Sequence, residues 1–92
     1  MKLLFVADPL SGFKTQKDST FAMMREAARR GHTLFACEPS GLAWQRGGHV
    51  TAWTQAIALT GRSGDGVHDW YTVLAEARHA LADFDAVVMR KD

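Results

Sequence analysis

The sequence predicts an α/β domain with a mostly parallel sheet, one main helix and a β-ribbon. Short apolar runs at residues 2–7 and 33–37 flank one well-marked helix, and this strand–helix–strand order has the length of a βαβ unit. Such units are right-handed in ~98% of cases, so the two strands should be parallel, with the helix on one face. At 92 residues, one domain with a single small core is expected.

The first apolar run ends at Asp8 and Pro9, which favour a turn. In the helix that follows, Asp18 and Ser19 are suitable N-cap residues, and Gly31 suits the left-handed residue that ends a helix. The apolar positions between these ends recur at helical spacing: Phe21, Met24 and Ala28. This helix is therefore predicted with both of its ends.

The second half of the chain is predicted to hold a ribbon and a last strand. Segments 42–45 and 50–59 flank Gly47 and Gly48, which adopt positive φ at little cost, so a β-ribbon is expected. Residues 61–66 are rich in glycine and predict an exposed loop. Residues 70–73 predict a strand, residues 74–81 one or two helical turns, and residues 86–89 the last strand.

Composition argues against several classes of partner. The net charge is +1 without a basic run, so nucleic acid is not expected to bind. The apolar start lacks the length and cleavage site of a secretory signal, and no segment approaches the ~20 apolar residues of a membrane span. We therefore expect no membrane and, by default, a cytoplasmic location. Cys37 is the only cysteine and the four histidines are scattered, so neither a disulfide within the chain nor a metal site is expected.

The sheet lacks visible cover for one of its faces. A mostly parallel sheet needs cover on both faces, yet only one full helix is evident. Trp44, Trp53, Trp70 and Tyr71 add much apolar surface. We therefore expect another subunit, or the remainder of a longer chain, to complete one face, which favours a homo-oligomer.

Charged residues follow three of the predicted strands. Ligands of open α/β sheets bind beyond the carboxyl ends of the strands, and these ends carry Asp8, Glu38 and the run Arg90, Lys91, Asp92. Arg90 and Lys91 could pair with an anionic substrate. They could equally be solvated residues of a polar loop.

The start of the helix is a second candidate site. Residues Lys17, Asp18, Ser19 and Thr20 open it, and its free N–H groups could hold a carboxylate or a phosphate. The alternative is a plain N-cap, and both interpretations can hold together. Residues 8–16 contain only Gly12 and match no phosphate-binding loop, so nucleotide is expected to bind elsewhere.

These residues lie in runs that resemble the start of prokaryotic glutathione synthetases. The runs are ADP at residues 7–9, KDSTFAMM at 17–24, EAARRGH at 26–32 and LADFDAVVMRKD at 81–92. The resemblance covers nearly the whole chain. It implies a Rossmann-like pre-ATP-grasp domain, followed in the intact protein by ATP-grasp domains that bind ATP and magnesium or manganese. Such enzymes activate the cysteine carboxylate of γ-glutamylcysteine as an acyl phosphate, which the amine of glycine then attacks.

The resemblance also implies which residues lie on the substrate side. These are Asp8, Lys17, Asp18, Ser19, Arg90, Lys91 and Asp92, and we expect Arg90 and Ser19 to contribute most. No catalytic, cofactor-binding or metal-binding residue is assigned, so this chain is expected to fold but not to catalyse alone. Two departures from the family, a longer segment 61–66 and the lack of proline in 75–80, put only local structure in doubt.

Two other functions are compatible with the residues. One is a free-standing flavodoxin-like module that binds a small anion, and the other is a scaffold whose exposed sheet face and tryptophans serve dimerisation. The coding sequence downstream of Asp92 discriminates among them, because a truncated ligase would continue into a glycine-rich ATP-grasp segment.

Overall fold

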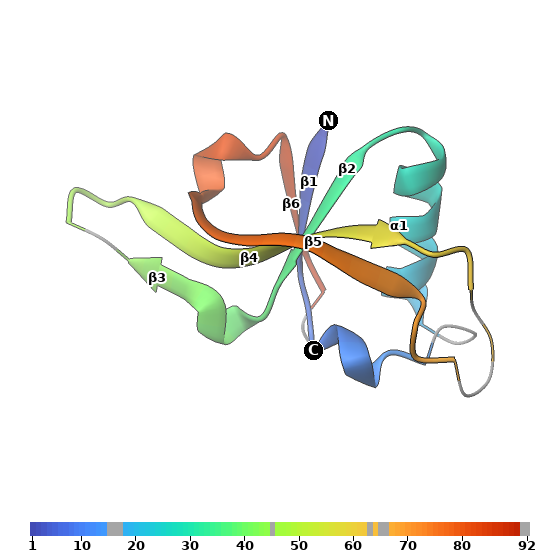
Figure 1. Ribbon diagram of the computed structural model, residues 1–92. Helices are drawn as coiled ribbons and strands as arrows, with labels where there is room; N and C mark the ends of the chain where they lie inside the picture. The colour runs from blue at the N-terminus through green and yellow to red at the C-terminus, as the bar shows by residue number, and fades with distance from the viewer. Residues whose placement is uncertain (15–17, 45, 63, 65–66, 91–92) are drawn as a thin grey trace.

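The computed structural model describes residues 1–14, 18–44, 46–62, 64 and 67–90 (Figure 1). In this part of the chain six strands form one sheet: β1 (Lys2–Val6), β2 (Thr33–Cys37), β3 (Leu42–Trp44), β4 (Val50–Leu59), β5 (Tyr71–Ala80) and β6 (Ala86–Met89). One α-helix, α1 (Ser19–Arg29), lies between β1 and β2. The short 3-10 turns are η1 (Leu10–Gly12), η2 (Pro39–Gly41) and η3 (Leu81–Asp83).

The sheet is mixed, and its parallel part lies at one end, where β6 is the edge strand. Strand β1 pairs in parallel with β2 on one side and with β6 on the other. Strand β4 is antiparallel to β2, and β3 and β5 are both antiparallel to β4. The α/β class, the main helix and the β3–β4 ribbon are therefore confirmed. The expectation of a mostly parallel sheet holds only for β2, β1 and β6, because the later strands return through short connections without a helical crossover.

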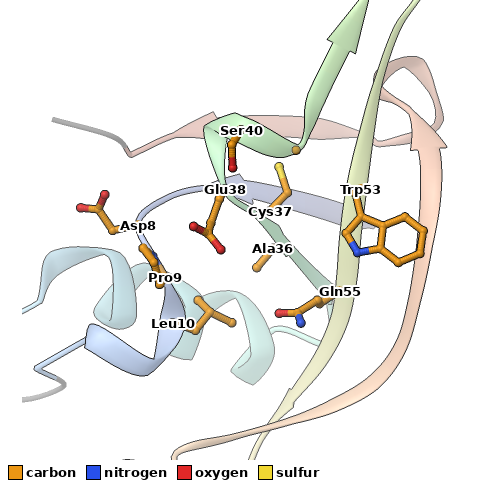
Figure 2. A pocket seen from close by; sticks show the side chains of 10 residues that line it. Asp8, Pro9, Leu10, Ala36, Cys37, Glu38, Ser40, Trp53 and Gln55 are labelled. Atoms are coloured by element: carbon orange, nitrogen blue, oxygen red, sulfur yellow. The ribbon is translucent and has the colours of Figure 1, made fainter.

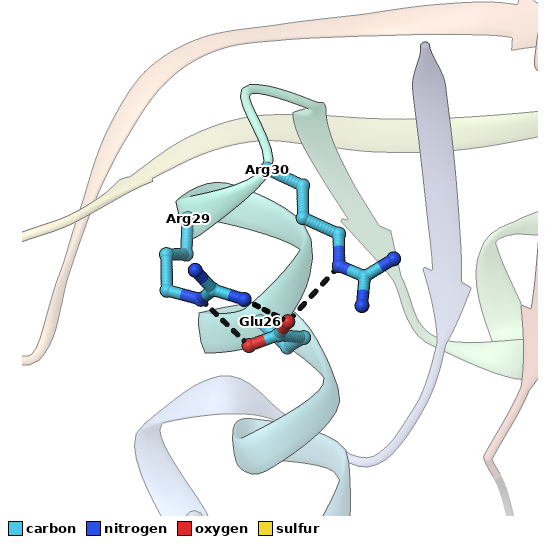
Figure 3. A network of polar contacts seen from close by, with 3 residues as sticks. All are labelled: Glu26, Arg29 and Arg30. Atoms are coloured by element: carbon cyan, nitrogen blue, oxygen red, sulfur yellow. Dashed lines mark hydrogen bonds and ion pairs between the residues drawn. The ribbon is translucent and has the colours of Figure 1, made fainter.

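Helix α1 begins and ends where its capping residues predict. The Asp18 carboxylate accepts hydrogen bonds from the backbone N–H groups of Thr20 (2.8 Å) and Phe21 (3.3 Å). At the other end Gly31 takes a left-handed φ of 84°. Near this end Glu26 pairs with Arg29 at 2.6 Å and with Arg30 at 2.9 Å (Figure 3). These contacts neutralise charge on the exposed side of the last turn.

The prediction of helical turns at residues 74–81 is wrong. Strand β5 continues to Ala80, and only the next three residues form a 3-10 turn. Along its whole length β5 pairs with β4, from Tyr71 opposite Leu59 to Ala80 opposite Thr51, with one register shift beside Ala56. Because β4 offers a ten-residue partner, strand pairing overrides the helical preference of this alanine-rich segment.

Side chains of alternating strand residues form a core on each face of the sheet. On the α1 side, Trp70 is 1% exposed and stacks on Phe13 with ring centroids 5.3 Å apart. On the other side the turn at η3 covers the sheet through Phe84, so α1 and η3 lie on opposite sides of β1 and β2 (Figure 1). Trp44 and Trp53 are 80% and 46% exposed. The predicted cover of this apolar surface by a partner therefore stays a prediction.

No helix in the described ranges is long and apolar enough to cross a membrane.

Candidate functional site

The carboxyl ends of β2, β1 and β6 meet at one edge of the sheet. The three strands are parallel, and their pairing continues one residue past their ends. The Ala7 N–H donates to the Cys37 carbonyl at 2.9 Å, and the Arg90 N–H donates to the Val6 carbonyl at 2.8 Å. The residues that follow β1, β2 and β6, namely Asp8, Glu38 and Arg90, therefore leave the sheet side by side.

The side chain of Arg90 connects the end of β6 to the start of α1. Its Nη2 donates to Ser19 Oγ at 2.6 Å, and its Nε donates to Thr20 Oγ1 at 3.2 Å. The two hydroxyls hold the guanidinium beside the first turn of the helix, where the helix dipole adds further positive potential. Opposite charge is favoured at this point, so the arrangement suits a carboxylate or a phosphate.

A cavity of about 400 Å³ lies at this junction, and we call it the Arg90 cavity. It is lined by Ala7, Asp8, Pro9, Ser11, Gly12, Phe13, Asp18, Ser19, Thr20 and Arg90. The structure thus brings together four of the residues that the sequence proposed: Asp8, Asp18, Ser19 and Arg90. Their roles in binding stay predictions. The carboxylate of Asp18 caps α1, so the capping interpretation holds for that residue whether or not a ligand binds nearby.

A second cavity of about 240 Å³ adjoins the first, and we call it the Glu38 cavity (Figure 2). Asp8 and Pro9 line both cavities. The other residues that line it are Leu10, Ala36, Cys37, Glu38, Ser40, Gly41, Trp53 and Gln55. Figure 2 shows the carboxylates of Asp8 and Glu38 on one side and the side chains of Trp53 and Gln55, from β4, on the other. The Glu38 cavity is therefore acidic, whereas the Arg90 cavity has a guanidinium.

Cys37 is a structural thiol of this edge. It is 8% exposed. Burial, and secondarily the negative charge of Glu38, raises the pKa of its thiol. A raised pKa keeps the sulfur protonated at neutral pH, so Cys37 has the properties of a packed side chain and not of a nucleophile.

Three of the proposed residues, Lys17, Lys91 and Asp92, lie outside the described residues. Within the described ranges no three His, Cys, Asp or Glu side chains group together as a metal site would require. The turn after β1 contains a single glycine, Gly12.

The sequence missed the lining residues that come from other elements. Thr20 is not one of them, since the sequence already places it at the start of the helix beside Ser19. Trp53 and Gln55 lie on the antiparallel strand β4, and no motif marks them. Their position depends on the order of the strands in the sheet, which no local signal in the sequence indicates.

Comparison with known proteins decides the family. The family model of the prokaryotic glutathione synthetase N-terminal domain matches residues 1–92. This chain belongs to that family. Glutathione synthetases of Neisseria meningitidis serogroup B and Ralstonia nicotianae are 48% and 49% identical to it over 92 residues, and that of Parasynechococcus marenigrum is 41% identical. Each alignment covers 100% of the chain but only 27–28% of the relative.

The glutathione synthetase N-terminal domain family accounts for the whole of this chain. The resemblance that the KDSTFAMM and LADFDAVVMRKD runs indicated is thereby confirmed. Because the chain spans little more than a quarter of these relatives, the fold and the family are established for the N-terminal domain alone.

Proposed function

We propose that this chain is the substrate-side domain of an ATP-dependent ligase that joins γ-glutamylcysteine to glycine, and that it binds γ-glutamylcysteine. The observation that carries the proposal is the pair of adjoining cavities that share Asp8 and Pro9, one with the guanidinium of Arg90 and the other with the carboxylate of Glu38. The γ-glutamyl group has both an ammonium and a carboxylate on its α-carbon. The carboxylate can therefore lie in the Arg90 cavity and the ammonium in the Glu38 cavity.

Each end of the γ-glutamyl group has a matching partner. Arg90 can donate to the carboxylate from its guanidinium, which Ser19 and Thr20 already orient. The carboxylates of Asp8 and Glu38 can accept hydrogen bonds from the ammonium. Pairing both charges of a zwitterion discriminates against ligands that carry only one of them.

ATP and magnesium, which the ligase reaction requires, would bind to a part of the full-length enzyme beyond this domain. This placement is supported by the single glycine of the turn after β1 and by the lack of a cluster of three metal-ligating side chains in the described ranges. The 92-residue chain alone is therefore expected to bind substrate without forming glutathione.

The test is calorimetric titration of this chain with γ-glutamylcysteine. Arg90→Ala should weaken binding by about 10- to 100-fold, since it removes a charge-assisted contact. Arg46→Ala is the matched control, because Arg46 is exposed in the turn between β3 and β4 and lines neither cavity. In the full-length protein the same Arg90 variant should raise KM for γ-glutamylcysteine. Equal affinity of the Arg90 and Arg46 variants would contradict the proposal.

A small-anion module is the second candidate, and the hydroxyl-held guanidinium of Arg90 beside α1 favours it. Inorganic phosphate discriminates between the two functions. A ligase domain should bind phosphate more weakly than γ-glutamylcysteine, and Glu38→Gln should weaken only the latter. Phosphate binding as tight as that of γ-glutamylcysteine, unaffected by Glu38→Gln, would favour the module.

A further inference from the structure

A third cavity, of about 370 Å³, lies between α1 and the end of β4, and we call it the Arg25 cavity (Figure 1). It shares no lining residue with the Arg90 cavity or the Glu38 cavity. Its volume is within the range of sites that hold small organic ligands. The Arg25 cavity has no role in the ligase function proposed above, and a ligand there would be independent of that function.

The buried part of the lining is apolar and aromatic. Phe21 is 4% exposed and Trp70 is 1% exposed, and their rings meet edge to face with centroids 5.2 Å apart. Leu59 adds an aliphatic side chain from the last position of β4. Such a lining offers dispersion contacts over a wide area, so it favours a ligand with a flat, apolar body.

The exposed part of the lining is cationic. Arg25, Arg29 and Arg62 line the Arg25 cavity, and the lining contains no aspartate or glutamate among the described residues. The guanidinium carbon of Arg25 lies 5.5 Å from the centre of the Phe21 ring, an attraction that keeps this cation beside the apolar surface. In the described part of the chain Arg25 has no carboxylate partner. Positive side chains from α1 and from the segment after β4 therefore border the same cavity.

Nearby carboxylates neutralise this positive charge only in part. Glu26 pairs with Arg29 but is shared with Arg30, which lies outside the cavity. Asp69 pairs with Arg62 at 3.1 Å. These ion pairs are exposed and therefore weak, so their guanidinium groups can also donate to a ligand. An anion in the cavity would find several donors within reach.

The indole N–H of Trp70 is a second, independent feature of the cavity. Trp70 lines the Arg25 cavity, and its Nε1 is buried without a hydrogen-bond partner among the described residues. Nearly all buried donors in proteins are paired, because an unpaired donor costs free energy. A bound ligand with an acceptor atom would give this N–H a partner.

We propose that the Arg25 cavity binds a small aromatic anion, that is, a flat ring system with one carboxylate or phosphate group. The ring lies against the buried apolar side chains, and the anionic group accepts hydrogen bonds from the guanidinium groups of Arg25 and Arg62. Because apolar contact and charge act on the same ligand, a ligand that lacks either part should bind more weakly.

Titration with naphthoate and with naphthyl phosphate, followed by two-dimensional proton–nitrogen NMR, tests the site. Each of the three tryptophans gives one indole signal, and Trp44→Phe and Trp53→Phe identify the signals that do not belong to Trp70. The Trp70 signal should shift with at least one probe, and the tighter probe identifies the preferred anionic group. Naphthamide has the ring without the charge and acetate has the charge without the ring, so each should bind at least about tenfold more weakly.

Substitutions on two sides of the cavity separate specific binding from general attraction of anions. Arg25→Gln and Arg62→Gln should each weaken binding of the tighter probe about 5- to 10-fold, since each removes a charge-assisted hydrogen bond. Arg30→Gln is the matched control, because Arg30 is exposed on the same helix but does not line the cavity, and it should leave binding unchanged. Ala28→Leu fills part of the cavity without a change of charge and should abolish binding.

Circular dichroism confirms that each variant is folded, and the exposed arginine variants test the site even if Ala28→Leu does not fold. Three results would overturn the proposal: a Trp70 signal that does not shift with either probe at millimolar concentration, naphthamide binding as tight as that of naphthoate and naphthyl phosphate, or equal affinities of the Arg25→Gln and Arg30→Gln variants.

Discussion

The most informative perturbation is the removal of the Asp18 cap from α1. Its carboxylate accepts two backbone hydrogen bonds, at 2.8 and 3.3 Å, and lies at the positive end of the helix dipole. Replacing an N-cap aspartate by alanine costs about 0.5–2 kcal/mol. Because two N–H groups lose their acceptor here, we expect Asp18→Ala to cost about 1–2 kcal/mol of the free energy of unfolding. For a chain of this length that lowers Tm by roughly 5–15 °C.

The loss should be cooperative, because α1 covers one face of the sheet. Phe21 and Met24 of the helix are 4% and 0% exposed and pack in the same core as Trp70. Urea unfolding followed by circular dichroism and by tryptophan fluorescence should therefore give coincident transitions at a lower midpoint. Asp18→Asn is the matched control, since asparagine caps a helix about as well. The capping argument fails if Asp18→Ala costs less than about 0.3 kcal/mol, or if the two variants are equally unstable.

The other predictions concern the core, the acid stability and the single thiol. Met24→Ala should lower the free energy of unfolding, measured in urea, by about 2–5 kcal/mol. Met23 is 41% exposed on the same helix, so Met23→Ala should lower it by less than about 0.5 kcal/mol. Equal losses of stability in the two variants would contradict the core position of Met24. Hydrogen bonds from its two arginine neighbours lower the pKa of Glu26 from 4.5 to about 2 (Figure 3). A lowered pKa stabilises the fold above pH 4.5, and the contribution is lost as the pH falls towards 2. Glu26→Gln should therefore flatten the dependence of stability on pH in this interval, and an unchanged profile would contradict the pairing. Cys37 should react slowly with a chromogenic disulfide reagent at neutral pH, and Glu38→Gln should speed the reaction by lowering the pKa of the thiol; equal rates would exclude an effect of the carboxylate.

Local signals in the sequence predict the βαβ part of the fold well. Helix α1 is marked at its start by Asp18 and at its end by Gly31, and both residues do in the structure what their chemistry favours. Strand β5 shows the limit of this approach. Its run of alanines with Glu76 and Arg78 favours a helix locally, but β4 pairs with it through nine residue pairs and decides its conformation.

The candidate site, too, is only partly predictable from local signals in the sequence. Parallel strands end at the same edge, so Asp8 and Arg90 could be placed together from the strand order of a βαβ fold. Trp53 and Gln55 could not, because they come from β4, and no local signal in the sequence sets the register in which β4 pairs with β2. A shift of one residue reverses the face of every side chain beyond it, so only the paired structure determines which residues of β4 line the Glu38 cavity.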